Sequence, residues 1–288
     1  CLLLAPVFAG GLVLSAADPA CGCAEEPVPI ATAEAPPEAP PEAPPAAPPA
    51  APPAPPGAAD VSPEVEQWLD RIEARADEIE TLRANVRYRR INVILGDEQT
   101  RFGRIVYHAG PPARFNAHFD RLVVADQLQR QDQRFIFDGR WLAERIVEDG
   151  GARRLFIRRE MVPEDEVGAD LLRIGEGPFA LPLDLQKHAT LERFTVELVA
   201  EDEPTIENAV VLRLTPRPHV DLEQTHIDLW YDRDTHLPAQ ARTVNDTDQT
   251  ESIIRMTHIE TGIEPDADAF DTTPPAEPGW QVEVRPLE

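Results

Sequence analysis

The part of the chain expected to fold has very few side chains that act as nucleophiles in enzymes. All three cysteines lie within the first 23 residues, so residues 61–288 contain none, and the serines of that part are Ser62 and Ser252 alone. Ser62 precedes a predicted helix as its N-cap, and Ser252 lies in a predicted strand without a Gly-x-Ser-x-Gly turn. Because a nucleophilic serine needs such a turn and a neighbouring base, catalysis by serine or cysteine is close to excluded.

Groups that bind metals or cofactors are equally scarce. The one lysine, Lys187, lies in a polar stretch, which argues against a Schiff base, and glycine-rich phosphate loops are absent. The seven histidines show no His-x-His, His-x3-His or His-Glu-x-x-His spacing. His226 and Asp228 share one strand face and could begin a metal site, but polar residues on a wet strand face explain the pair better. We therefore expect no catalytic residue, no metal, no cofactor and no enzymatic activity.

Positive charge is also in deficit. The formal net charge is −25, and residues 1–60 carry seven acidic residues and no Lys or Arg, which leaves −18 for residues 61–288. A protein this acidic is not expected to bind nucleic acid or to adsorb to anionic lipid. Its positive charge is almost all arginine interleaved with acidic residues. That pattern is typical of a solvated sheet face and indicates no basic patch.

The features that are present begin with an export signal in residues 1–23. The apolar run Cys1–Ala17 is short for a bilayer span and resembles the apolar core of a secretory signal peptide without its basic start. Gly22 before Cys23 fits part of a lipidation signal, so Cys23 is a candidate for acylation; two cysteines at the end of a removed signal are the alternative. We expect secretion across the inner membrane and a periplasmic protein, tethered through its N-terminus if Cys23 is lipidated.

Residues 24–60 are expected to be a disordered linker. They are dominated by a Pro/Ala/Glu repeat that cannot bury a core and favours extended polyproline II. At about 3.1 Å per residue, such a segment spans on the order of 90 Å. The linker would therefore act as a spacer between an anchored N-terminus and the third part of the chain, residues 61–288.

A helix is predicted at the start of residues 61–288. Ser62 is suited to cap it and Pro63 to begin it, and apolar residues recur at helical spacing as far as Leu82. This amphipathic helix should pack on the concave face of a sheet.

Residues 84–146 predict consecutive antiparallel strands, because apolar side chains occupy alternate positions. The first strand is expected to run from Ala84 to Leu95 with a bulge at Arg89-Arg90. Asp138-Gly139 predicts a hairpin turn, since both positions accept positive φ. The expected strands are 84–95, 102–108, 114–119, 122–125, 134–137, 141–146, 153–159, 191–199, 209–215, 225–231, 239–244, 251–259 and 280–284.

Residues 163–183 differ in character from their surroundings. A short helix is expected at Asp165–Ile174, followed by an apolar, proline-rich loop that contains Phe179 and Leu181. The loop would be either a core plug or a lid. The expected fold class is thus α+β and mainly β: a strongly curved antiparallel sheet forming an unclosed half-barrel, covered by the N-terminal helix and this helical or loop lid.

The apolar face of such a sheet makes either a filled core or a cavity for a hydrophobic ligand. Core packing explains each apolar residue singly, and only the whole set suggests a cavity. The candidates to face it are Val86, Tyr88, Phe102, Phe115, Ala117, Phe119, Phe135, Phe137, Trp141, Leu155, Phe179 and Leu181.

The order of these elements resembles the periplasmic outer-membrane lipoprotein carriers, the LolA-like family. The resemblance covers most of residues 63–288 and rests on short motifs in a characteristic order. After the N-terminal helix come Pro112-Ala113-Arg114-Phe115, Phe137-Asp138-Gly139 with Trp141, Leu212–Pro216, Ile227–Asp232 with Leu237-Pro238, Ile254–Ile259, and Phe270 before Pro274-Pro275.

The resemblance implies a carrier that holds acyl chains of lipoproteins or other lipids inside the half-barrel and exchanges them with membrane-bound donor and acceptor proteins. Burial of alkyl surface, about 0.8 kcal/mol per CH₂, would drive binding without a cofactor. The sequence predicts such a carrier or a tethered relative. The alternatives are a periplasmic sensor or regulator of the RseB type, which shares the fold, and a non-catalytic structural envelope protein with a filled core.

Overall fold

The computed structural model describes residues 61–151, 153–163, 183, 185–200, 205–247 and 249–287. Residues 1–60, with Cys23 and the linker, lie outside the described residues. So do Phe179, Leu181 and the helix expected at 165–174.

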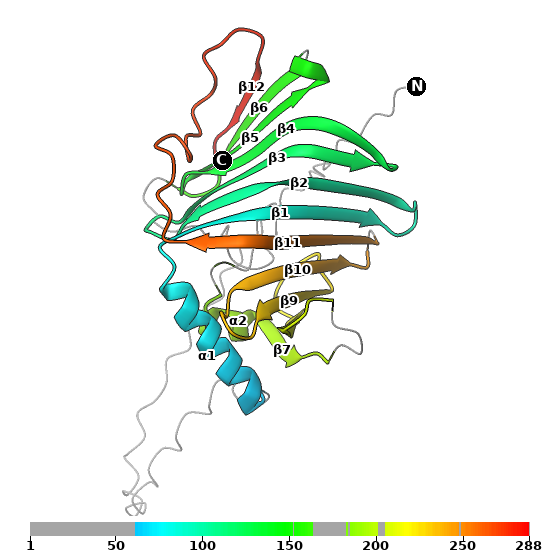
Figure 1. Cartoon of the computed structure of the whole chain (residues 1–288), viewed down its shortest axis with the longest axis vertical. Coiled ribbons are helices and arrows are strands. Elements are labelled where there is room, and N and C mark those ends of the chain that lie inside the picture. The colour runs from blue at the N-terminus through cyan, green and yellow to red at the C-terminus, as the bar shows by residue number, and fades with distance from the viewer. Residues whose placement is uncertain are drawn as a thin grey trace, which may run out of the picture. The chain divides into compact units, whose positions relative to one another are not determined.

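Twelve strands form one curved sheet that does not close into a barrel (Figure 1). Their order across the sheet is β12-β6-β5-β4-β3-β2-β1-β11-β10-β9-β8-β7. All neighbours pair antiparallel except β12, which lies parallel to β6. The bounds are β1 Thr81–Asn92, β2 Asp97–His108, β3 Arg114–Val124, β4 Gln127–Phe137, β5 Trp141–Glu148, β6 Arg153–Glu160, β7 Phe194–Leu198, β8 Ala209–Pro216, β9 His226–Asp232, β10 Pro238–Asn245, β11 Thr250–Thr261 and β12 Gln281–Arg285. The expected fold class, mainly β with an unclosed half-barrel, is confirmed.

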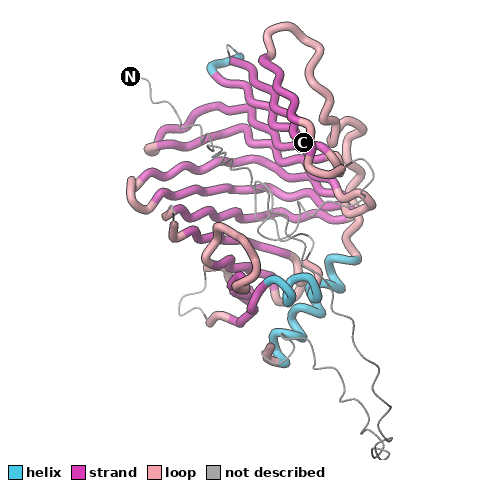
Figure 2. Tube along the Cα trace, turned by 180° about the vertical axis from the view of Figure 1, so that it is seen from behind, coloured by secondary structure: helices cyan, strands magenta, loops and turns pink. Residues whose placement is uncertain are grey.

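The first helix, α1 (Pro63–Asp77), begins where the sequence predicts. The Ser62 hydroxyl accepts a hydrogen bond from the Val65 amide at 3.2 Å, so Ser62 is the N-cap. The helix ends five residues before Leu82, because β1 begins at Thr81 and Leu82 is a fully buried strand residue. The two α-helices of the described residues, α1 and the short α2 (Lys187–Arg193), lie at the β7–β10 end of the sheet (Figures 1 and 2).

Several strand predictions are wrong at their ends. The strands expected at 114–119 and 122–125 form the single strand β3, β2 begins at Asp97 rather than 102, and β4 begins at Gln127 rather than 134. β1 stops at Asn92, whose side chain accepts from the Leu95 amide at 2.9 Å and closes a turn. Val93, Ile94 and Leu95 therefore lie in that turn, with 60% to 70% of their surface exposed. The bulge predicted at Arg89-Arg90 is absent, because β1 pairs with β2 without interruption there. The register shift in β1 occurs instead against β11, between Arg83 and Asn85.

The strand expected at 191–199 is shorter than predicted, because its first residues belong to α2 and β7 starts at Phe194. The Phe194 amide still donates to the Thr190 carbonyl, which joins the helix directly to the strand.

We call the sheet face that carries Val86, Phe115 and Phe137 the inner face, and the opposite one the outer face. The main hydrophobic core lies on the inner face and includes the buried side of α1. A second, smaller cluster of Ile136, Ala143 and Phe156 packs on the outer face, against the half-buried Trp280.

The Asp138-Gly139 turn between β4 and β5 is confirmed. Asp138 Oδ1 accepts from the amides of Arg140 and Trp141 at 2.9 and 2.7 Å, and Gly139 has a φ of 103°. Asp138 Oδ2 accepts from the hydroxyl of Thr272 at 2.5 Å. Thr272 belongs to residues 262–280, the C-terminal segment, which leads from β11 to β12 past the ends of the intervening strands (Figure 1).

Candidate functional site: the inner face of the sheet

Five of the predicted cavity residues meet on the inner face and are buried. These residues, Val86, Phe115, Ala117, Phe119 and Phe137, are at most 4% exposed. Strand register brings them together, because Phe115 lies opposite Phe137 on β4 and Ala117 opposite Phe135. Alternation in a strand puts every second side chain on the same face, so this part of the prediction followed directly from the sequence.

Half-buried aromatic rings extend this cluster. Tyr88 and Phe135 pack against the core without being enclosed by it. The Tyr88 and Phe119 ring centroids lie 6.3 Å apart, and those of Phe119 and Phe135 lie 6.4 Å apart in an edge-to-face arrangement. Three adjacent rings therefore follow the inner face from β1 to β4 at distances typical of favourable aromatic pairs.

Two predicted residues lie on the outer face instead. Phe102 alternates with the inner residues of β2, and its ring lies between Arg87 and Arg121. Trp141 alternates with the inner residue Leu142, and the Arg158 guanidinium lies 4.1 Å from its ring centroid. Both were expected inside because they are aromatic, but the position within the strand decides the face.

Further inner-face residues were missing from the sequence-based set. Ile105, Tyr107 and Leu142 are buried in the main core, and strict alternation within their strands would have found them. Leu155 is on the inner face as predicted, because it lies opposite Ile146 on β5, but it is only half-buried and stands outside the main core cluster. Apolar side chains thus continue along the inner face over β5 and β6.

Polar groups interrupt the inner face between Tyr88 and β5. Gln133 is 7% exposed, and its amide donates to Glu144 Oε1 at 2.9 Å, while its own Oε1 has no hydrogen-bond partner among the described residues. Arg101 lies opposite Tyr88, and burial lowers the pKa of its guanidinium. The Tyr88 hydroxyl donates to Ser252 Oγ at 3.3 Å. The inner face therefore carries a polar band beside its aromatic cluster.

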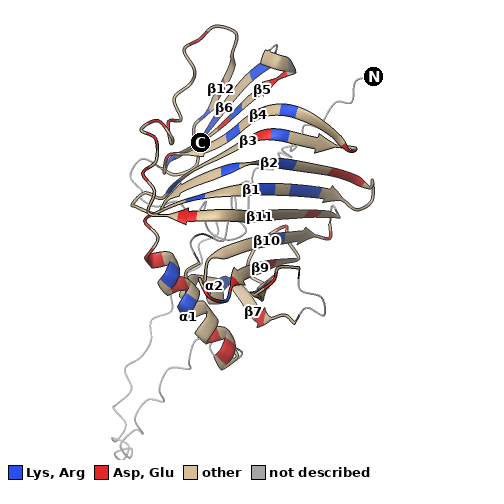
Figure 3. Ribbon diagram, viewed as in Figure 1, with Lys and Arg blue, Asp and Glu red and all other residues tan. Residues whose placement is uncertain are grey.

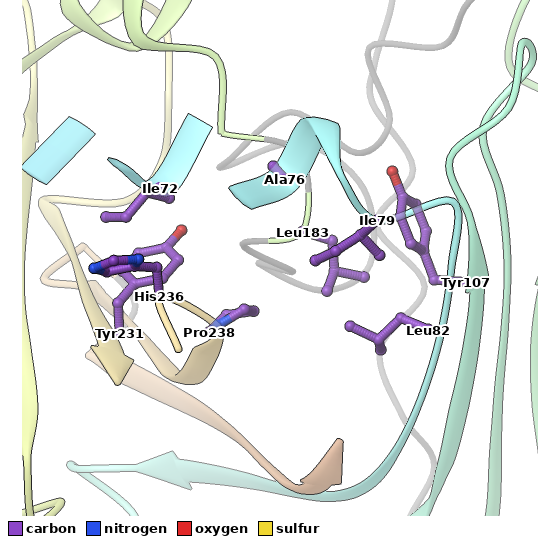
Figure 4. A pocket seen from close by; sticks show the side chains of 9 residues that line it. All are labelled: Ile72, Ala76, Ile79, Leu82, Tyr107, Leu183, Tyr231, His236 and Pro238. Carbon is purple, nitrogen blue, oxygen red and sulfur yellow. The ribbon is translucent and has the colours of Figure 1, made fainter. Parts of the chain in front are cut away.

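The α1 end of the inner face is filled. The cavity there encloses about 10 Å³, close to the space that one water molecule needs (Figure 4). Its lining comes from α1 and the residues after it, from β1, β2, β9 and β10, and from Leu183 and the β9–β10 turn: Ile72, Ala76, Ile79, Leu82, Tyr107, Leu183, Tyr231, His236 and Pro238. Tyr231 is fully enclosed, and burial raises the pKa of its hydroxyl. This end is core, and accessible apolar surface lies toward β4, β5 and β6.

Asp228 is not on a wet strand face. It is 2% exposed and accepts from Arg213 Nε and Nη2 at 2.7 and 3.1 Å, and from Arg242 Nη1 at 3.5 Å. The hydrogen bond to Asp228 raises the pKa of Arg213. His226 Nε2 is 3.7 Å from the same carboxylate. Two arginines therefore neutralise the charge of Asp228 and supply its hydrogen bonds. The described ranges hold no group of three or more His, Cys, Asp or Glu side chains arranged to bind a metal.

Among the helices of the described residues, none is long and apolar enough to cross a bilayer.

No family model matches the chain, and no curated protein matches it. Among solved structures, the crystal structure of MucB is 23% identical over 73% of this chain, with a TM-score of 0.40. The chain spans 63% of MucB, less than two thirds of its length.

Two further solved structures are nearly covered by the chain. One, described as an outer membrane lipoprotein-sorting protein domain from Vibrio parahaemolyticus, is 12% identical over 71% of this chain and 95% of its own, with a TM-score of 0.35. A LolA superfamily protein from Nitrosomonas europaea is 13% identical over 70% of this chain and 97% of its own, with a TM-score of 0.31. These two carry the family names that the sequence resembles. At such identities and TM-scores they carry no argument about this chain, and its function has to be inferred from its own residues.

Proposed function

We propose that the protein binds acyl chains of lipoproteins or other lipids on the inner face of its sheet and carries them in the periplasm. The observation that supports this most directly is the apolar surface that continues past the enclosed core. Phe135, Ile146, Leu155 and Ile157 stand on the inner face of β4, β5 and β6 and are only half-buried. Gln133 and Glu144 lie on the same face between Phe135 and the apolar residues of β5 and β6, so the accessible surface combines apolar side chains with two polar groups. An accessible group of apolar side chains beside polar ones suits a ligand with an alkyl chain and a polar end.

The physical driving force is burial of alkyl chain. Each CH₂ transferred from water contributes about 0.8 kcal/mol, so a chain of a dozen carbons gains enough to bind without a covalent step or a cofactor. The half-buried rings of Tyr88 and Phe135 offer apolar walls, with the enclosed Phe119 ring packed between them, and the polar band of Arg101, Gln133 and Glu144 lies beside them. Phe179 and Leu181, which the sequence also assigns to the site, lie outside the described residues.

Secretion and tethering belong to the same proposal. The signal-like residues 1–23 direct the chain across the inner membrane, and residues 24–60 separate the sheet from an anchor at Cys23. A tethered protein of this kind would exchange acyl chains with donor and acceptor proteins within reach of its linker. It would do so without catalysis.

An inner-face substitution and an outer-face control test acyl binding. Phe135→Asp places a carboxylate in the half-buried aromatic row, so uptake of a fluorescent long-chain fatty acid should weaken by at least about tenfold, because the charge must be desolvated beside the alkyl chain. Phe102→Asp makes the same chemical change on the outer face of β2 and should leave uptake unchanged. Circular dichroism reports whether both variants are folded.

The same two variants also give the results that would contradict acyl binding on the inner face. Equal uptake by wild type and folded Phe135→Asp would contradict an inner-face site, and uptake lost only in Phe102→Asp would move binding to the outer face. If the wild-type chain takes up neither fatty acid nor acylated peptide, the result would favour the alternative of a non-catalytic structural envelope protein with a filled core.

A further inference from the structure

A groove lies on the outer face, across β11, β1, β2 and β3. Its volume is about 700 Å³. Basic residues are frequent on β1 to β4 in this part of the sheet (Figure 3). The lining residues are Asn85, Val86, Arg87, Phe102, Gly103, Arg104, His118, Asp120, Arg121, Arg255 and Thr257. Four arginines and one acidic residue line this groove, although the chain as a whole carries a net charge of −25. The expectation of no basic patch is therefore wrong for this part of the sheet, because strand pairing brings the arginines together.

Strand register orders the lining into two rows across four neighbouring strands. The first row reads Arg255, Arg87, Phe102, Arg121, and the second reads Thr257, Asn85, Arg104, His118. Arg255 and Arg87 are direct cross-strand partners. Like charges at directly opposed positions destabilise a sheet, so packing of the fold does not explain this pair.

The chain supplies carboxylates to the arginines on either side of the groove. On the same face of β1, Arg83 pairs with Glu260 at 2.5 Å, and Arg89 makes two hydrogen bonds to Glu98 at 2.7 and 2.6 Å. Arg87 lies between these two positions on the strand. Within the described residues, Arg87, Arg104 and Arg255 have no carboxylate within 4 Å. Three guanidinium groups of one groove are thus left without the partner that their neighbours have.

Phe102 is the aromatic residue of this groove. The guanidinium carbon of Arg87 lies 5.8 Å from its ring centroid and that of Arg121 5.3 Å, both within cation–π range. The ring is half-buried and lies between the two arginines of its row. It can therefore pack against an apolar or aromatic group while the arginines bind anions on either side.

We propose that this groove binds an acidic peptide segment of a partner protein. Four strands at about 4.8 Å spacing span about 14 Å, which four or five extended residues cover at about 3.3 Å each. Carboxylates on such a segment can form paired hydrogen bonds with Arg87, Arg104 and Arg255, since guanidinium groups match carboxylates in a planar fork. An apolar side chain between the carboxylates packs on Phe102.

A peptide fits this groove better than an anionic membrane surface. Residues 61–288 carry a net charge of −18, which repels an extended anionic plane, while a short segment meets only the local positive potential. The arginines also line a hollow, and a narrow chain reaches its floor more readily than a flat surface of lipid headgroups. This site is independent of acyl binding on the inner face.

A charge-matched peptide pair tests the proposal with the full chain. Fluorescence anisotropy would measure binding of a labelled nonapeptide, Glu-Ser-Glu-Ser-Trp-Ser-Glu-Ser-Glu, and of the same peptide with Gln in place of Glu. The acidic peptide should bind, more weakly as salt rises, and the Gln peptide should not. Arg87→Gln and Arg255→Gln should each weaken binding at least about tenfold, and Phe102→Leu several-fold.

Arg89→Gln is the matched control, because Arg89 lies on the same strand face but already pairs with Glu98. It should change affinity less than about twofold. Arg87→Gln should unfold at the same temperature as wild type or higher, because it removes a like-charge pair.

Three results would overturn the proposal: equal binding of the acidic and Gln peptides, equal losses in Arg89→Gln and Arg87→Gln, or wild-type affinity in Arg87→Gln. The last part of the experiment measures binding of the wild-type chain and of Arg87→Gln to vesicles that contain phosphatidylglycerol. Arg87-dependent binding to these vesicles without binding to the peptide would assign the groove to lipid headgroups instead.

Discussion

At the scale of single residues, ion pairs in this protein are distributed unevenly between the sheet interior and its surface. Asp228 is enclosed between Arg213 and Arg242, whereas pairs such as Glu283 with Arg285 are open to solvent. A charge-assisted hydrogen bond inside a protein contributes more than an exposed one, because removing one partner leaves the other poorly solvated. Exposed pairs contribute little.

Asp228→Asn should therefore lower the free energy of unfolding by about 2 to 3 kcal/mol, since both arginines lose a carboxylate that is 2% exposed. Urea denaturation followed by circular dichroism measures the change. Glu283→Gln removes an exposed carboxylate and should leave the free energy of unfolding nearly unchanged. Similar losses in both variants would show that the burial of Asp228 has no energetic consequence.

The sequence could predict that His226 and Asp228 share a strand face, because that follows from alternation alone. It could not predict that Arg213 and Arg242 come from β8 and β10 on either side of β9, since strand order and register arise from tertiary pairing. The same limit explains why the outer-face groove was not foreseen. Arg255 is distant in sequence from Arg87 and Arg104 and joins them only because β11 pairs with β1.

At the scale of elements, the C-terminal segment holds the outer face together. The buried Thr272 hydroxyl donates to Asp138 at the β4–β5 turn and accepts from Arg158 Nη2 of β6 at 3.2 Å. The Asn116 side-chain amide of β3 donates to the Ala269 carbonyl at 2.6 Å, and the Arg114 guanidinium lies 5.0 Å from the Phe270 ring centroid. These contacts position the chain so that β12 can pair with β6, the edge strand of the antiparallel part.

Thr272→Val should release this attachment. Loss of the hydroxyl leaves Asp138 Oδ2 and Arg158 short of a partner, so stability should fall by about 1 to 2 kcal/mol. Hydrogen exchange in β12 and residues 262–280 should accelerate, while that of β8 to β10 stays unchanged. Thr195→Val, at an exposed position on β7, is the control. Uniform acceleration across the sheet would show that the segment is not a separate cooperative unit.

Features that depend on local hydrogen bonds were the most predictable. The Ser62 cap and the Asp138-Gly139 turn depend on local hydrogen bonds, and both occur as expected. Ile79 and Leu82 continue the apolar spacing of α1, yet they lie beyond its last residue, because a strand that needs buried residues begins immediately after it. Val93 to Leu95 are apolar residues in an exposed turn, and β-propensity alone could not reveal this.

At the scale of the whole sheet, the two faces of β1 to β6 have opposite characters. The inner face carries the core, the aromatic rings and the accessible apolar residues of β4 to β6, and the outer face carries the arginine groove. Alternation within the strands puts most of these side chains on opposite faces, so one sheet can bind an alkyl chain on one side and an acidic segment on the other. The α1 end, with its cavity of about 10 Å³, serves stability rather than binding.

Native mass spectrometry of the full chain purified from cells tests acyl binding most directly. The account predicts co-purified lipid, or a one-to-one complex after addition of a long-chain acylated peptide, and loss of that complex in Phe135→Asp but not in Phe102→Asp. A lipid-free mass with no uptake of the acylated peptide by the wild-type chain would contradict it, because accessible apolar surface on β4 to β6 would then have no ligand.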